Sequence, residues 1–234
     1  MIRKALILAG GLGTRLRKTV PNLPKPMAPL NGRPFLEYQM DYCISQGIDE
    51  FFISVGYLNE KIVNHFGTIY KNKRINYIFE DKQLGTGGAI LKSEKFINED
   101  FIILNGDTYF EIDFSILERE HINTGSKFTL ALFKNKINSR YLGIELSNRN
   151  KVINLNKSSS CLSNGGVYIV DKSIFHDLDL ELDKFISLEE DIFPVLIDRK
   201  TPFYGKLFSD FFIDIGIPED YNKAKKYLKN SHSC

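Results

Sequence analysis

The chain has 234 residues, of which 43% are hydrophobic and 26% are charged, proportions typical of a soluble globular protein. Lys and Arg number 31 and Asp and Glu 29, a formal charge of +2, so the basic surplus of a general nucleic-acid binder is absent. The cysteines Cys43, Cys161 and Cys234 are widely spaced, which favours reduced thiols in a cytoplasmic protein over disulfides or a metal cluster. No stretch approaches the roughly 20 apolar residues of a membrane span.

The first half of the chain alternates apolar strands with helical patterns. Residues 4–9 form a nearly continuous apolar run before Gly10 and Gly11, typical of a buried parallel strand that ends in a tight turn. Prolines recur up to Pro29 and predict an extended loop. A helical pattern opens at Pro34 and closes at Gly47. Further strands are expected at 51–55, 75–79 and 101–104, and further helices at 60–69 and 87–96.

The second half has a different texture, with short strands separated by turns, expected at 128–133, 143–146, 152–155 and 167–170. Ser187 and Glu190 form a capping-box pattern for a helix over 187–197 that kinks at Pro194. A strand at 211–215 and a basic helix at 218–228 follow. No linker or internal repeat is visible, so we expect residues 1–234 to form one domain with two unequal lobes.

Alternating strands and helices predict right-handed βαβ units and a mostly parallel sheet with helices on both faces. Ligands of such sheets bind at the carboxyl ends of the strands. Unusual polar sequence follows or interrupts three predicted strands, at residues 10–15, at 105–107 and at Asp214. If these segments converge, they form a site.

The run Leu-Ala-Gly-Gly-Leu-Gly-Thr-Arg at residues 8–15 places glycines where backbone N–H groups can approach anionic oxygens. A plain glycine turn is the alternative, and the run lacks both the Walker ending and the dinucleotide-binding spacing. Lys25 favours the functional interpretation. It stands between Pro24 and Pro26, which restrict the backbone on both sides of it.

Together, Gly-Gly-x-Gly-Thr-Arg at 10–15 and Pro-Lys-Pro at 24–26 resemble the signature of the sugar-1-phosphate nucleotidylyltransferases, and the resemblance spans nearly the whole chain. It implies a Rossmann-like α/β/α sandwich with a mixed, mostly parallel central sheet and a smaller sugar-covering lobe. The nucleotide-binding half would span about residues 1–125 and the sugar-binding half about 126–234. The implied reaction joins a nucleoside triphosphate (NTP) to a sugar 1-phosphate and releases pyrophosphate.

The resemblance also implies the residues that bind the nucleotide. Arg15 would hold the β and γ phosphates and Lys25 the reacting phosphate, since a rigid guanidinium suits a bidentate clamp and an ammonium a compact charge. The thymidylyl members place a glutamine side chain near the nucleobase, where this chain has Gly88 instead. The lack of a side chain at Gly88 would leave room for a purine, which favours GTP. The nucleotide-binding residues are predicted to be Leu8, Ala9, Gly10, Gly11, Gly13, Thr14, Glu80, Gly85, Thr86, Gly88, Asn105 and Gly106.

Two aspartates are the candidate metal ligands. A lone Asp after a strand is more often a turn or cap residue, but the resemblance pairs Asp107 with Asp214, which lies in a Phe-Ile-Asp-Ile-Gly run. Mg²⁺ typically takes one or two carboxylates and completes its shell with water and phosphate oxygens. The resemblance therefore implies Mg²⁺ as the cofactor.

Sugar recognition rests on shorter matches. The resemblance implies that the sugar phosphate is bound by Gly143, Lys157, Asn164, Gly166, Tyr168 and Glu189. Two of these have plain alternatives. Lys157 could be a solvated loop lysine, and Glu189 could serve only the dipole of the helix that begins beside it.

Within the family, the Arg-x-x-Val-Pro loop at 17–21 and the Leu-Gly-Thr-Gly-Gly run most resemble D-glycero-α-D-manno-heptose 1-phosphate guanylyltransferases of surface-polysaccharide pathways. The alternatives are a mannose-1-phosphate guanylyltransferase or another hexose-1-phosphate enzyme and, more remotely, a glycosyltransferase or a non-catalytic nucleotide-sugar-binding module. No nucleic-acid or membrane partner is expected. The scattered aromatic residues are compatible with a homodimer interface or with the core alone.

Overall fold

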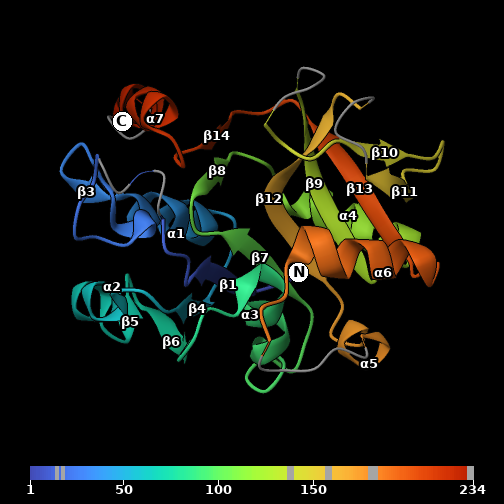
Figure 1. The fold of residues 1–234 in the computed structure, drawn as a ribbon, viewed down its shortest axis with the longest axis horizontal. Helices are drawn as coiled ribbons and strands as arrows, with labels where there is room; N and C mark the ends of the chain where they lie inside the picture. Colours follow the sequence, from blue (N-terminus) through green and yellow to red (C-terminus); the bar gives the residue numbers. More distant parts are fainter. Residues whose placement is uncertain (14–15, 17–18, 136–139, 156–159, 179–183, 231–234) are drawn as a thin grey trace.

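An eight-stranded mixed sheet runs across the molecule in the order β13-β9-β12-β7-β1-β4-β6-β5 (Figure 1). The computed structural model describes residues 1–13, 16, 19–135, 140–155, 160–178 and 184–230. Strands β7, β1, β4 and β6 pair in parallel, as do β9 and β13. Strand β12 is antiparallel to both of its neighbours, β7 and β9, so it joins the two parallel sets into one sheet.

The strands are β1 Lys4–Ala9, β2 Pro29–Leu30, β3 Arg33–Pro34, β4 Glu50–Val55, β5 Ile69–Tyr70, β6 Lys73–Phe79, β7 Phe101–Asn105, β8 Thr108–Phe110, β9 Phe128–Lys134, β10 Ile144–Leu146, β11 Val152–Leu155, β12 Leu162–Val170, β13 Phe203–Phe208 and β14 Phe212–Asp214. The α-helices are α1 Phe35–Ser45, α2 Asn59–Phe66, α3 Gly85–Ser93, α4 Phe114–Thr124, α5 Ile174–Asp177, α6 Phe193–Asp198 and α7 Pro218–Asn230. A 3₁₀ helix spans Lys25–Met27 and a π-helix spans Leu188–Ile192.

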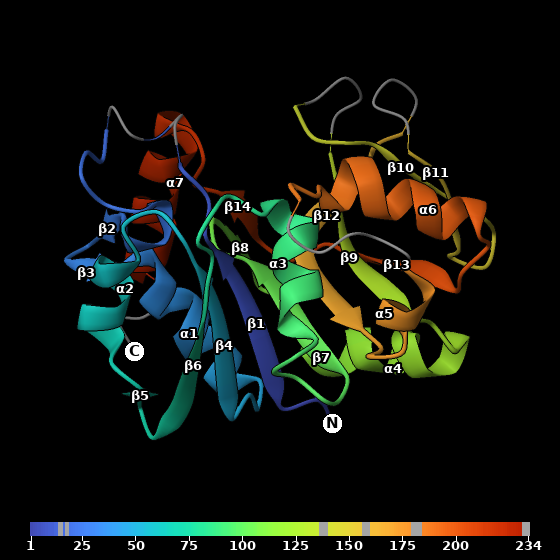
Figure 2. The ribbon, with the colours of Figure 1, turned by 60° about the horizontal axis from the view of Figure 1, so that its bottom comes forward.

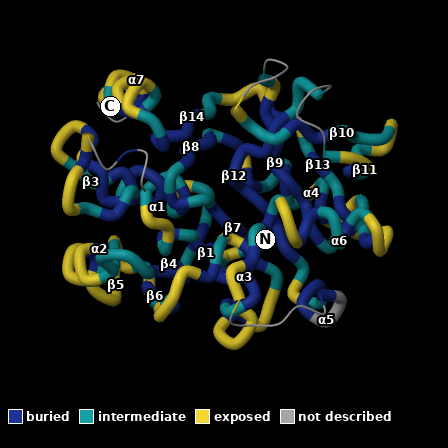
Figure 3. Tube along the Cα trace, in the orientation of Figure 1, coloured by how far each residue is buried: buried dark blue, intermediate teal, exposed yellow. Residues whose placement is uncertain are grey.

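Alternation along the strands divides the core between the two faces of the sheet. Ala5 and Ile7 of β1 pack in a cluster with α1, α2 and α4, whereas Leu6 packs in a second cluster with α3 and α6. Figure 2 shows α3 and α6 on one side of the strands, and Figure 3 shows the central strands buried and most exposed stretches at the periphery. The predicted α/β/α sandwich is confirmed.

A third cluster attaches α7 beside this sandwich. It contains Phe35 and Tyr38 of α1, Ile213 of β14 and Tyr221 of α7, all buried. Strand β14 lies outside the main sheet and pairs antiparallel with β8. The C-terminal helix and β14 are thereby held against the first half of the chain rather than the half in which they lie in the sequence.

Most predicted elements are confirmed, with differences at their ends that have local causes. Helix α2 ends at Phe66 rather than Ile69, because Gly67 has a φ of 60° and breaks the helix. Helix α3 begins two residues earlier than predicted, at Gly85. Strand β12 begins five residues earlier than predicted, and Gly166, with a φ of 74°, lies at a register shift within it.

The sequence patterns missed the helices α4 and α5, the 3₁₀ helix at Lys25–Met27, the strand β13 and the short strands β2, β3, β5 and β8. The capping box before the π-helix is half correct. The Ser187 hydroxyl accepts a hydrogen bond from Glu190 N, but Ser187 N donates to Asp191 Oδ2 rather than to Glu190. The helical segment changes from π to α at Phe193, next to the predicted kink at Pro194.

Within the described residues, every helix is too short or too polar to cross a membrane. Cys43 and Cys161 are free thiols, as predicted. Cys234 lies outside the described residues.

Candidate active site

A cavity of about 420 Å³ opens where the parallel strands β1, β6 and β7 end. Residues from both halves of the chain surround it. Its lining residues are Leu8, Ala9, Gly10, Gly11, Gly13, Lys25, Pro26, Glu80, Gln83, Gly85, Thr86, Ala89, Asn105, Gly106, Asp107, Tyr168, Phe185, Ser187, Leu188 and Glu189. Its position at the carboxyl ends of the strands is the one expected for an open α/β sheet.

The glycines of the first loop permit close approaches that a side chain would prevent. A Cβ on Gly10 would lie 2.1 Å from Glu80 Oε1, and a Cβ on Gly13 would lie 3.2 Å from Lys25 Cβ. Gly13 also has a φ of 60°, a conformation that favours glycine. The loop is therefore packed directly on Glu80 and on the Pro-Lys-Pro segment, which joins the two parts of the predicted signature in space.

Lys25 and Asp107 form an ion pair at one end of the cavity, with 2.5 Å between Nζ and Asp107 Oδ2. The Lys25 side chain is only 11% exposed. The 3₁₀ helix that carries it follows the extended Pro24. The turn that carries Asp107 is held by Gly106 N, which donates to Leu8 O, and by Gln39 Nε2, which donates to Asn105 O and Thr108 O.

Asp214 lies beside this pair, although it does not line the cavity. Ile215 N donates to Asp107 O at 2.9 Å, so the last strand runs directly along the Asp107 turn. Asp214 Oδ1 accepts from Gly216 N at 2.6 Å and Oδ2 accepts from Arg140 Nη2 at 3.1 Å. Burial and the charge of Asp107 raise the pKa of the Asp214 carboxyl, because both disfavour its ionised form.

The donor chemistry of this pair fits a hard divalent cation. Asp107 and Asp214 supply carboxylate oxygens from adjacent segments, and such oxygens are the ligands that Mg²⁺ prefers. Among the described residues, no cluster of three or more His, Cys, Asp or Glu side chains is arranged to hold a metal ion.

Side chains from the second half form a polar cluster at the cavity, in which Asn164 and Tyr168 are buried and Glu189 is half-buried. Asn164 Nδ2 donates to Tyr168 Oη at 2.8 Å and to Glu189 Oε1 at 3.0 Å, and Asn164 Oδ1 accepts from Gly166 N. The Tyr168 hydroxyl lies 3.5 Å from Asn105 Oδ1 of the first half. These predicted sugar-binding residues are therefore brought together, and the Tyr168 hydroxyl reaches Asn105 of the first half.

The remaining predicted residues have mixed positions. Gly143 forms an isolated bridge with Ser163 and does not line the cavity. Gly166 does not line it either, and a Cβ there would lie 2.5 Å from Thr108 Oγ1, so this glycine permits close packing. Thr86 lines the cavity, and its hydroxyl accepts a hydrogen bond from Leu188 N. Thr14, Arg15 and Lys157 lie outside the described residues.

The prediction that Gly88 leaves room for a purine is wrong. Gly88 does not line the cavity, and a Cβ there would lie 3.3 Å from Lys184 O and 3.0 Å from Leu84 Cβ. Gly87 N and Gly88 N both donate to Ile186 O. The missing side chain leaves room for a crossing main chain and not for a purine, and Ala89 faces the cavity instead.

Sequence patterns missed several residues of the site. Gln83 lies between the predicted residues Glu80 and Gly85. No sequence pattern indicated Phe185, an aromatic side chain that lines the cavity and is 60% exposed. Ser187 and Leu188 lie at a helix start for which the sequence predicts only a capping role, yet both line the cavity. Arg140 was also missed, although it lies three residues before the predicted Gly143.

Comparison with known proteins agrees with this geometry. The family described as Nucleotidyl transferase matches residues 4–231. The D-glycero-alpha-D-manno-heptose 1-phosphate guanylyltransferase of Aneurinibacillus thermoaerophilus is 44% identical over 97% of this chain and 99% of its own length. The protein of the same name from Campylobacter jejuni is 41% identical over 93% of this chain and 96% of its own.

Solved structures of a related protein also resemble this chain. The crystal structure of HddC from Yersinia pseudotuberculosis is 33% identical, covers 97% of this chain and 100% of that one, and superimposes with a TM-score of 0.85. HddC has also been solved complexed with GMP-PN, with a TM-score of 0.82.

The fold and the cavity thus define an α/β enzyme of nucleotidyl transfer. This chain belongs to the nucleotidyl transferase family. The family, the fold and the enzymatic nature predicted from the sequence are confirmed.

Proposed function

We propose that this chain transfers GMP from GTP to D-glycero-α-D-manno-heptose 1-phosphate and releases pyrophosphate. The observation that carries the proposal is the ion pair of Lys25 and Asp107 beside Asp214, at one end of a glycine-lined cavity. One cation and two carboxylates suit a reacting phosphate and its metal. The choice of GTP and heptose is supported by the names of the two relatives and by the GMP-PN complex of HddC.

In the proposed reaction a phosphate oxygen of the sugar 1-phosphate attacks the α-phosphorus of GTP in line, and the bond to pyrophosphate breaks. The nucleophile is already an anion, so no side chain has to accept a proton. His65 pairs with Glu37, His121 is buried against Thr129, and neither lines the cavity. Catalysis then consists of positioning and charge neutralisation by Lys25 and by Arg15.

We propose Asp107 and Asp214 as the ligands of Mg²⁺. Two carboxylates suffice because Mg²⁺ completes its shell with water and phosphate oxygens. A shared cation would also offset the burial of Asp214 and its repulsion by Asp107, which raise the pKa of that carboxyl. When bound, the metal supplies charge neutralisation at the phosphates.

Glu80 offers a physical reason for guanine that Gly88 does not. Its carboxylate lines the cavity, with Oε1 accepting from Ser54 Oγ at 2.7 Å and Oε2 from Leu84 N at 3.3 Å. A carboxylate only accepts hydrogen bonds. Guanine is the base that presents two adjacent N–H donors on one edge, so Glu80 favours GTP over the other triphosphates.

The sugar end of the cavity is proposed to lie at the Asn164–Tyr168–Glu189 cluster. Glu189 has acceptor oxygens and Asn164 both donor and acceptor atoms, which suits the hydroxyl groups of a sugar. Gly143, Gly166 and Lys157 remain proposed members of this subsite on the resemblance alone.

The test is a matrix of the four common NTPs against several sugar 1-phosphates, including the heptose and mannose compounds, with pyrophosphate release as the readout. The proposal expects the highest kcat/KM with GTP and the heptose compound. Preference for UTP, CTP or dTTP contradicts the guanylyl assignment, and a better rate with mannose 1-phosphate contradicts the heptose. Release of a nucleoside diphosphate from a nucleotide sugar would instead identify a glycosyltransferase.

The product of this reaction, a nucleotide sugar, is a glycosyl donor, so a glycosyl transfer must consume it. We propose that the enzyme works in the cytoplasm, where GTP is available, and supplies activated heptose for a surface polysaccharide. A strain without the enzyme should then lack heptose in that polysaccharide, and unchanged heptose content contradicts the proposal.

A further inference from the structure

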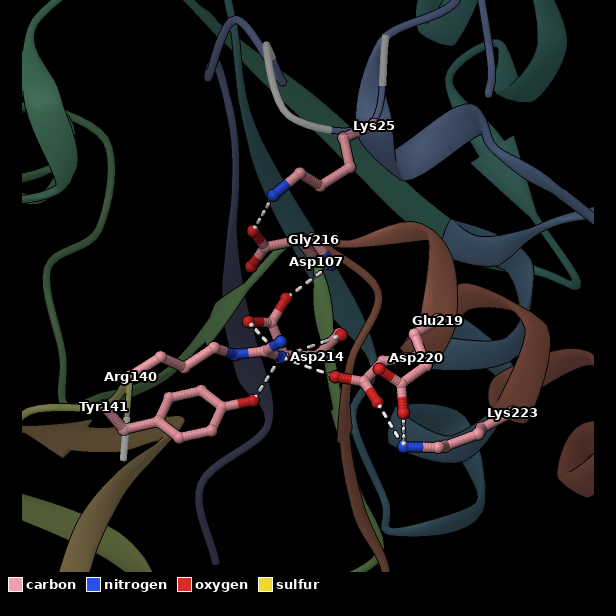
Figure 4. A network of polar contacts seen from close by, with 9 residues as sticks. All are labelled: Lys25, Asp107, Arg140, Tyr141, Asp214, Gly216, Glu219, Asp220 and Lys223. Carbon is pink, nitrogen blue, oxygen red and sulfur yellow. Dashed lines mark hydrogen bonds and ion pairs between the residues drawn. The ribbon is translucent and has the colours of Figure 1, made fainter. Parts of the chain in front are cut away.

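Arg140 approaches the two aspartates from the side opposite Lys25 (Figure 4). One guanidinium nitrogen, Nη2, lies 3.1 Å from Asp214 Oδ2 and 2.8 Å from Asp220 Oδ2. The same nitrogen lies 2.5 Å from the hydroxyl of Tyr141. The Arg140 side chain is 28% exposed, so most of it is packed against the protein.

Aromatic packing holds Arg140 in this place. The guanidinium carbon of Arg140 lies 4.7 Å from the centroid of the Tyr141 ring. That ring packs edge-on against Phe133 and Phe212, whose own rings stack with centroids 3.9 Å apart. Phe212 begins the strand that ends at Asp214, so the packing that positions Arg140 also positions its partner.

Each of the two central aspartates already has a cationic partner. Lys25 pairs with Asp107, and Arg140 is shared between Asp214 and Asp220, while Lys223 pairs with Asp220 and Glu219 at the edge. A divalent cation that binds the two aspartates must come close to two positive groups already paired with them. Coulomb repulsion between neighbouring positive charges is strong in a partly buried site.

A nucleoside triphosphate would change the pairing of these charges. Its phosphates carry several negative charges and attract Lys and Arg side chains, so they offer Lys25 and Arg140 partners other than the aspartates. They also offer oxygen ligands to the metal. Metal and nucleotide should therefore bind together far more readily than the metal alone.

We propose that Arg140 is the internal counter-ion of Asp214 and that, with Lys25, it prevents the aspartate pair from binding a divalent cation in the absence of a nucleoside triphosphate. The inference rests on the proposed function, because it takes Asp107 and Asp214 as the metal ligands.

The test measures the binding of Mn²⁺ alone, by titration calorimetry or electron paramagnetic resonance, to the full chain without nucleotide. Arg140→Gln should bind Mn²⁺ at least about tenfold more tightly than the wild type, because one repelling charge is gone. Arg140→Lys keeps the charge and should stay within about threefold of the wild type. Arg140→Met keeps the apolar stem on Tyr141 and replaces Arg140→Gln if that variant does not fold.

Lys223→Gln is the matched control. It removes the same charge from the same network, but Lys223 contacts Glu219 and Asp220 and neither of the paired aspartates. Its Mn²⁺ affinity should remain close to that of the wild type. Adding Asp107→Asn to Arg140→Gln should abolish the gain, since the proposed metal ligand is then lost.

Three results overturn the inference: an Arg140→Gln affinity equal to or weaker than the wild type, an equal gain in Lys223→Gln, or a gain that survives Asp107→Asn. The first would mean that Arg140 orients Asp214 instead of neutralising it. Failure of the proposed metal site is seen separately, as pyrophosphate release by the wild type that persists in excess EDTA.

Discussion

Pro24 and Pro26 restrict the backbone on both sides of Lys25, and the structure shows where that restriction leads. The residue begins a single 3₁₀ turn, packs against Gly13 and points its ammonium at Asp107. A solvated lysine would need none of these constraints. The proposed role of Lys25 on the reacting phosphate therefore agrees with its local structure and with its sequence pattern.

Lys25→Ala should lower the rate of pyrophosphate release about 10²- to 10³-fold, a loss of roughly 3 to 4 kcal/mol of transition-state stabilisation, with the fold preserved. Asp107→Asn should also lower transition-state stabilisation by several kcal/mol, because it changes a proposed ligand of the metal. The measurement is kcat/KM for GTP by a pyrophosphate assay. Lys73→Ala is the control, since Lys73 pairs with Asp49 outside the cavity, and its activity should be unchanged. Near-normal activity of Lys25→Ala would remove it from the catalytic machinery.

At the scale of elements, the first turn of α3 is bound by the chain that crosses it from the second half. Ile186 N donates to Leu84 O, and Ile186 O accepts from Gly87 N and Gly88 N. Such a carbonyl partner satisfies donors that are unpaired at every helix start. The glycines at 85, 87 and 88 are thus explained by a main-chain crossing that local sequence does not reveal.

Gly85→Ala and Gly125→Ala form a matched pair that measures this crossing. Both glycines have a positive φ, 76° and 57°, but a Cβ at Gly85 would lie 2.4 Å from Ile186 O, whereas none of the surrounding atoms lies within 4 Å of one at Gly125. Gly125→Ala should lose about 1 to 2 kcal/mol of unfolding free energy from backbone strain alone. Gly85→Ala should lose about 1 to 3 kcal/mol more from the clash and should also bind GTP less tightly. Equal losses in denaturant titrations would contradict the crossing.

Helix α4 was missed, yet its ends carry recognisable signals. Asp113 accepts from Ser115 N at 2.7 Å at the start, and Gly125 adopts the left-handed conformation at the end. Asp113→Ala should lower the unfolding free energy by about 1 kcal/mol at neutral pH, whereas Asp113→Asn should lose much less.

The effect of Asp113 should depend on pH. The hydrogen bond to Ser115 lowers the pKa of Asp113 from its usual 3.8, so its stabilisation is present above 3.8 and is lost as pH falls through the folded value. The difference between Asp113→Ala and the wild type should therefore shrink well below pH 3.8. A difference that is constant with pH in urea titrations would show that the cap does not act through its charge.

At the scale of the molecule, the two halves share one sheet. Strand β12 pairs with β7 of the first half and with β9 of the second, and β14 returns to pair with β8. The cavity takes its lining from both halves. This continuity supports the prediction that residues 1–234 act as a single domain, and the homodimer stays a prediction.

The chain should accordingly unfold in one cooperative transition. Because it contains 11 tyrosines and no tryptophan, tyrosine fluorescence and far-ultraviolet circular dichroism are suitable probes, and their denaturation curves should coincide. Two separated transitions would contradict a single domain and would assign each half its own stability.

The sequence by itself determined the strands of the first half, the glycine-rich and Pro-Lys-Pro signature and the family, because these depend on local patterns of residue types. Apolar runs form buried strands, glycines permit tight loops, and prolines constrain Lys25. Only the tertiary structure placed Asp214 beside Asp107, brought Arg140 between Asp214 and Asp220, and brought Ile186 over α3. Those contacts join segments far apart in the chain, and their geometry follows from sheet order and packing, which no local pattern specifies.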